Sequence, residues 1–137
     1  MAEPAHDRVR EAGREAAGPW FLSLCGPLVH DGDGHQTATA RFLPRPDAPV
    51  ESQSALALEA LHQISCRLAA AVRGARRCVP VRLDEFRGTA SSTEPEHLLR
   101  ARVLRSGPLS TVEATVTVGH TTYRATVCTR EIQAGRA

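Results

Sequence analysis

The residues best suited to chemistry lie close together near the middle of the chain, at Glu59, His62 and Gln63. Side chains three or four residues apart share one face of a helix, so these three groups would be neighbours in a helical segment. A carboxyl group and an imidazole serve as general acids and bases in enzymes, and Gln63 could orient the carboxyl one turn away. The pattern fits acid–base chemistry, but Glu59 could equally pair with Arg67 or lie at a solvated edge.

Metal and redox chemistry are not indicated by the remaining residues. The cysteines are far apart and form no Cys-x-x-Cys pair, so we expect free, mostly buried thiols and no zinc site; they are Cys25, Cys66, Cys78 and Cys128. His30 and His35 flank an Asp-Gly-Asp-Gly sequence that is typical of a tight turn and lacks the later ligands of a calcium loop. We therefore expect neither a metal nor a cofactor.

Length and composition predict one small globular domain. The chain has 137 residues, of which 42% are hydrophobic and 23% charged, and its net charge of +2 is too small to indicate nucleic-acid binding. It holds no run of apolar residues long enough to cross a membrane without a charge, and residues 1–17 lack the apolar segment of a secretory signal. We therefore expect a cytoplasmic protein that binds neither membranes nor nucleic acids.

One long helix is predicted over Ser54–Arg73, because this segment contains no glycine or proline. Apolar residues cover nearly all of its sides, which is typical of a helix buried on most sides. Ser52 or Ser54 is suited to cap its start, and Gly74 is suited to end it.

Strands are expected on both sides of this helix. An apolar segment from Trp20 to His30 and an alternating one from His35 to Phe42 predict a hairpin, followed by a proline-rich loop. Four alternating segments after the helix predict strands over residues 78–87, 96–105, 109–118 and 120–132. A lone apolar helix in this order is covered only if the sheet curls around it, which predicts an α+β hotdog fold with about six antiparallel strands over residues 18–132. Residues 1–17 would form a leader, frayed or helical, and residues 133–137 a tail.

Three segments resemble the hotdog-fold 3-hydroxyacyl-acyl-carrier-protein dehydratases. Ala55–Gln63 is similar to the start of that family's central helix, Pro19–Leu22 to its opening Tyr-Pro-Phe-Leu, and Phe86–Gly88 to a strand region. The resemblance spans roughly residues 18–131. The family's loop histidine is absent, since Phe42–Val50 keeps the prolines but contains no histidine.

The resemblance implies a function and a set of site residues. Glu59 corresponds to the family's catalytic acid, with Gln63, Ser54 and His62 as groups that orient the substrate. Because family members dimerise and each site takes its histidine from the other subunit, we expect either a homodimer or a heterodimer with a histidine-bearing dehydratase-like partner. The substrate would be a 3-hydroxyacyl chain on an acyl carrier protein in fatty-acid or polyketide biosynthesis.

Basic residues after the helix offer a docking surface for an acidic carrier protein, which would use Arg73, Arg76 and Arg77. The alternative is an ordinary solvated face. Two further functions fit the same residues: a hotdog acyl thioesterase that uses Glu59, or a non-catalytic subunit that stabilises a partner.

Overall fold

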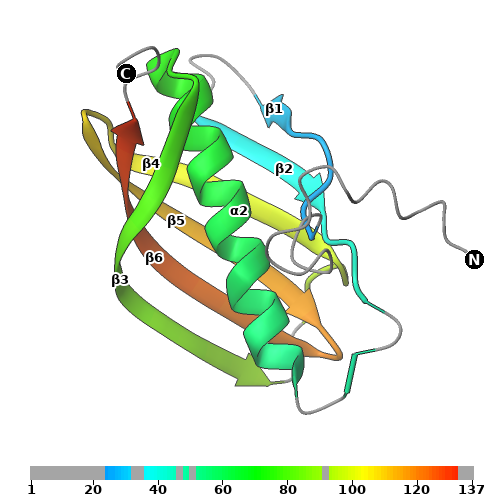
Figure 1. Cartoon of the computed structure of the whole chain (residues 1–137). Helices are drawn as coiled ribbons and strands as arrows, with labels where there is room; N and C mark the ends of the chain where they lie inside the picture. The colour runs from blue at the N-terminus through cyan, green and yellow to red at the C-terminus, as the bar shows by residue number, and fades with distance from the viewer. Residues whose placement is uncertain (1–23, 32–35, 46–47, 50–51, 91–92, 133–137) are drawn as a thin grey trace, which may run out of the picture.

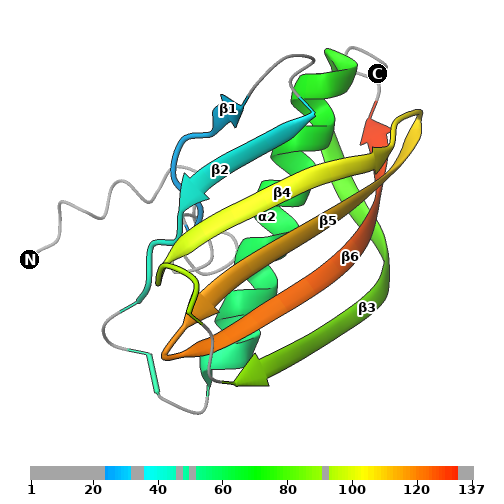
Figure 2. The ribbon, with the colours of Figure 1, turned by 180° about the vertical axis from the view of Figure 1, so that it is seen from behind.

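A six-stranded antiparallel sheet curves around one long helix in the computed structural model (Figures 1 and 2), which describes residues 24–31, 36–45, 48–49, 52–90 and 93–132. The strand order is β1-β2-β4-β5-β6-β3. The elements are β1 (Val29–Asp31), β2 (Thr37–Arg41), α2 (Gln53–Arg73), β3 (Arg77–Ala90), β4 (Leu98–Arg105), β5 (Leu109–Val118) and β6 (Thr121–Ile132). This arrangement confirms the predicted α+β hotdog class; the expected leader, tail and Trp20 segment lie outside the described residues.

The helix ends at Arg73 as expected and starts one residue before the predicted Ser54. It begins at Gln53, so Ser52 occupies the N-cap position, one of the two predicted, but its side chain makes no capping hydrogen bond. Ser54 already lies inside the first helical turn. At the other end Gly74 has a left-handed φ of 66°, which glycine adopts without a steric penalty.

The core forms between the inner side of α2 and the concave face of the sheet. Along β4 and β5 every second residue is buried, as expected for strands with one solvated face. The largest fully buried aliphatic side chains of the two layers are Leu61, Ile64 and Leu68 from the helix and Leu99, Val112, Val116 and Val127 from the strands. Burying each of these side chains contributes about 1.5–3 kcal/mol, so this contact is the main stabilising feature of the domain.

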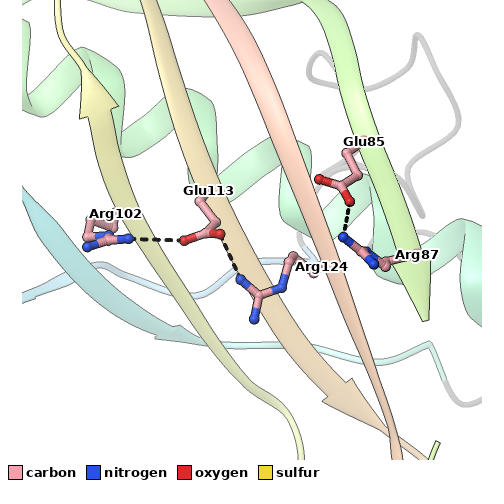
Figure 3. Close-up of polar contacts among 5 residues, drawn as sticks. All are labelled: Glu85, Arg87, Arg102, Glu113 and Arg124. Carbon is pink, nitrogen blue, oxygen red and sulfur yellow. Dashed lines mark hydrogen bonds and ion pairs between the residues drawn. The ribbon is translucent and has the colours of Figure 1, made fainter. Parts of the chain in front are cut away.

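The convex face of the sheet is polar. Glu113 on β5 accepts hydrogen bonds from Arg102 on β4 at 3.3 Å and from Arg124 on β6 at 2.7 Å, as Figure 3 shows. Exposed ion pairs of this kind contribute only about 0–1 kcal/mol each. This face is therefore solvated surface and adds little to stability.

By length and composition α2 could cross a membrane, since an 18-residue window reaches a mean hydropathy of 1.2. Half of that window is buried inside the domain, as in the core helix of a globular protein, which passes the same test. The hydropathy of α2 is therefore only weak evidence for a membrane-spanning helix. The packing of α2 against the sheet explains why the helix is apolar.

Shortening a core side chain of the helix tests this packing. Leu61 is fully buried, so Leu61→Ala should lower the free energy of unfolding by about 2–5 kcal/mol in urea titrations. Leu104→Ala is the matched control, because Leu104 is 50% exposed and its loss should change stability by less than about 0.5 kcal/mol. Equal effects of the two substitutions would contradict the placement of α2 at the core.

Candidate functional site

The polar side of α2 brings three of the predicted site residues together. Gln63 Nε2 donates a hydrogen bond to Glu59 Oε2 at 3.3 Å, and His62 Nδ1 lies 4.0 Å from Glu59 Oε1. The Glu59 side chain is 38% exposed and that of His62 is 23% exposed. Glu59 is therefore partly exposed to solvent, because the sheet covers one side of the helix and Glu59 lies on the other.

A short segment preceding β1, Leu24–Gly26, lies against the same side of the helix and is here called the strap. The backbone N–H of Leu24 donates to Gln63 Oε1 at 3.1 Å. Arg67 Nη1 donates to the carbonyl oxygens of Cys25, at 2.7 Å, and Gly26, at 3.3 Å. Gln63 therefore links the strap to Glu59 and restricts the rotamers of both side chains.

The strap also belongs to the β2 side of the sheet. The N–H of Gly26 donates to the carbonyl of Arg41 at 2.9 Å, and Cys25 forms an isolated antiparallel bridge with Phe42. Since Arg67 is engaged with the strap, it forms no ion pair with Glu59, and the alternative pairing considered from the sequence is wrong.

A hollow of about 170 Å³ lies at the N-terminal end of α2. It is mainly apolar and is lined by Phe42, Pro44, Arg45, Ala48, Pro49, Gln53, Leu56 and Val118. Gln53 Nε2 donates to the carbonyl of Val118 at 3.1 Å and to the hydroxyl of Tyr123 at 3.3 Å, which fixes one wall. Glu59 does not line this hollow. Neither does Ser54, an exposed residue whose side chain makes no hydrogen bond with the described part of the chain.

Two residues near this hollow were missed from the sequence. The position of Gln53 could have been predicted from the sequence, because a polar residue that starts a helix after a proline-rich loop is well placed to form hydrogen bonds with the sheet. No sequence pattern pointed to His97. Its ring packs edge-on against Phe42 with 5.6 Å between centroids, and its φ of 63° is unusual for a non-glycine residue. Only the pairing of β2 with β4 brings these two residues together.

The three predicted docking arginines have different environments. Arg73 Nε forms an ion pair with Glu131 at 2.9 Å, so its charge is largely neutralised. Arg76 and Arg77 are exposed and form no ion pair with the described residues.

The thiols are free, as predicted; Cys25, Cys78 and Cys128 are buried and Cys66 is half-buried. Burial, with smaller contributions from the nearby charges of Cys78 and Glu59, raises the pKa of Cys66 to about 12, so this thiol is unreactive at neutral pH. Among the described residues no three His, Cys, Asp or Glu side chains are placed to hold a metal ion. His35 lies outside those residues.

Comparison with known proteins gives a likeness of fold only. No family model matches the chain, and no curated protein matches it. Among solved structures it is similar to Cj0977, a sigma28-regulated virulence protein from Campylobacter jejuni, with a TM-score of 0.51 and 13% identity over 84% of this chain and 89% of that one. This match supports the hotdog-like arrangement, and the dehydratase family rests on the sequence resemblance alone.

His62 should make the protein less stable in acid. Burial lowers the pKa of His62 below its ordinary value of 6.5, with the Glu59 charge opposing this shift, so the unfolded chain binds the proton more readily than the folded one. Stability therefore falls as the pH drops through 6.5 and keeps falling until the folded pKa is passed. His62→Gln should remove this part of the loss when urea midpoints are compared above and below that range. The exposed His120→Gln is the control, and unchanged pH dependence in His62→Gln would contradict the prediction.

Proposed function

We propose that this chain is a dehydratase-like hotdog subunit that acts in the cytoplasm on 3-hydroxyacyl chains carried by an acyl carrier protein. Glu59 would be its catalytic acid, in a site completed by a second hotdog subunit. The observation that carries the proposal is the placement of Glu59 on the outward side of the core helix, where Gln63 holds it by a 3.3 Å hydrogen bond.

Dehydration of a 3-hydroxyacyl chain needs one general base and one general acid. A base takes the proton from C2 of the acyl chain, and an acid gives a proton to the 3-hydroxyl group, which leaves as water while the C2–C3 double bond forms. Glu59 would be the group that gives the proton to the leaving 3-hydroxyl. The strap supports this role, because it fixes Gln63 through the N–H of Leu24 and so limits the rotation of Glu59.

The base would come from the second subunit. The chain has no histidine between His35 and His62, and so none in the loop after β2 where the related family carries its base. A partner with an intact loop histidine would complete one site per heterodimer. In such a pair Glu59 supplies the acid and the partner supplies the base.

Hydrolysis of the thioester is the second candidate. The lack of a loop histidine, together with His62 only 4.0 Å from Glu59, favours a carboxylate that activates water or attacks the acyl carbonyl. This reaction releases a free acid and not an unsaturated thioester. A chain with neither activity would be a stabilising subunit.

The role of Glu59 is tested by mass spectrometry of carrier-bound 3-hydroxyacyl thioesters. With a histidine-bearing partner we expect loss of one water, and Glu59→Gln in this chain should slow that step by about 100-fold or more. Glu94→Gln is the matched control, because Glu94 is an exposed carboxylate away from α2. If the complex that carries Glu59→Gln is as fast as the unchanged complex, the proposal is contradicted, and release of free acid would favour the thioesterase.

Reversal of charge tests carrier-protein docking. Arg76→Glu together with Arg77→Glu should weaken binding of an acidic carrier protein several-fold in low salt, and the difference should shrink above about 0.5 M salt. Arg100→Glu on the convex face is the control, since Arg100 lies across the sheet and near Glu94. Equal binding by all three proteins in titration calorimetry would show that these arginines do not contribute.

A further inference from the structure

A polar hollow of about 610 Å³ lies on the convex face of the sheet, beside the end of β3. Strand β3 contributes Arg87 and Thr89 to its lining, β6 contributes Thr122 and Arg124, and the segment after β3 contributes Thr93. Figure 3 shows both arginines on the face of the sheet that points away from α2. The hollow is therefore separate from the candidate site on the helix.

The register of β3 and β6 places two matching pairs of residues in this hollow. Arg87 lies opposite Arg124, and two residues further along β3 Thr89 lies opposite Thr122. Alternate residues of a strand share one face, so all four side chains project to the same side. With strands about 5 Å apart and a rise of about 3.3 Å per residue, the four positions mark a rectangle of about 5 Å by 7 Å.

The two arginines form a like-charge pair across neighbouring strands, which is an unfavourable arrangement unless an anion lies between them. Each guanidinium is held by a carboxylate that lies outside the hollow. Arg87 donates to Glu85 of its own strand, and Arg124 donates to Glu113 of β5 at 2.7 Å (Figure 3). These contacts orient both cations and leave the space between them unoccupied by an acidic side chain of either strand.

The surrounding acidic residues do not cancel the positive charge. Glu113 also accepts a hydrogen bond from Arg102 at 3.3 Å, so two guanidinium groups share one carboxylate and the group keeps one net positive charge. Glu94 borders the hollow, but its carboxylate lies 3.7 Å from the guanidinium of Arg100. The hollow therefore attracts an anion.

The hollow also offers enough hydrogen-bond donors for a phosphate group. A guanidinium has five N–H groups, and the ion pairs use Nη2 of Arg87 and Nη1 of Arg124. The hydroxyls of Thr89 and Thr93 make no hydrogen bond with the described part of the chain, while the Thr122 hydroxyl bonds a neighbouring threonine at 2.7 Å. Paired guanidinium groups match the oxygen atoms of phosphate in both charge and geometry.

We propose that this hollow binds the phosphate group of a small phosphorylated sugar or polyol. A phosphate fills the space of two or three water molecules, about 30 Å³ each, so most of the hollow remains for an organic group. The described residues that line it include threonines but no aromatic side chain, so they suit a hydroxylated group and offer a nucleotide base nothing to stack on. The inference goes beyond the proposed function, since it requires neither Glu59 nor a second subunit.

Titration calorimetry of the purified full chain in low salt tests the proposal, with glucose 6-phosphate as the probe. We expect saturable binding with a dissociation constant below about 1 mM, binding of inorganic phosphate at least about threefold weaker, and no binding of glucose. Adenosine monophosphate should bind no more tightly than glucose 6-phosphate. The proposal is overturned if glucose 6-phosphate does not bind up to about 10 mM, or if inorganic phosphate or the nucleotide binds equally well or better.

Single substitutions test whether binding occurs in this hollow. Arg87→Gln and Arg124→Gln should each weaken the binding of glucose 6-phosphate at least about tenfold, and Thr89→Val about threefold. Arg102→Gln is the matched control, because Arg102 shares the Glu113 carboxylate with Arg124 but lies on β4, outside the hollow. It should change the affinity by less than about twofold.

The control also separates a built site from general attraction of anions. An equal loss of affinity in Arg102→Gln and Arg124→Gln, or unchanged affinity in both Arg87→Gln and Arg124→Gln, overturns the proposal. Circular dichroism confirms that each variant is folded. None of these results bears on the Glu59 assay, which is read from product mass.

Discussion

The burial of one side of α2 against a curved sheet is the contact on which the rest of the structure depends. Leu61, Ile64 and Leu68 are completely buried, and the sheet must bend to reach them all. A flat sheet touches a helix along a narrow line, so curvature is what converts an apolar helix into a core. The helix connects β2 to β3, which is the last strand on the far side of the sheet.

The curvature of the sheet also determines which sides of α2 remain exposed. The sheet covers the inner side of the helix, and on the outer side only one of the two flanks is covered. The strap closes the flank near β2 through hydrogen bonds from Arg67 and to Gln63. The flank near β3 has no such segment among the described residues, and Glu59 with His62 lies on the outward side between the two flanks. Gln63 connects this candidate site to the strap, on the β2 flank.

The sequence was sufficient to predict the helix, the strands and their order along the chain. The absence of glycine and proline defined α2 to within one residue at its start, and the alternation from Leu109 to Val118 predicted β5 with its observed bounds. Both elements are predictable because a local sequence pattern determines local structure. The grouping of Glu59, His62 and Gln63 was predictable for the same reason, since helical spacing alone brings them together.

Features that depend on distant parts of the chain were not predictable in this way. The engagement of Arg67 with the strap, and the packing of His97 on Phe42, join residues that are far apart in the sequence. The exposure of Glu59 is another case. An apolar helix suggests burial on most sides, but how many sides the sheet covers is set by its curvature, which no single segment encodes.

The exposure of Glu59 limits what this chain does alone. A carboxyl group that is 38% exposed is solvated, and in water a hydrogen bond or a charge gives little selective stabilisation of a transition state. Acid catalysis at this position therefore requires that something displace water from the outer side of α2. A second chain that covered the outer side of α2 would do so, as the proposed two-subunit site requires.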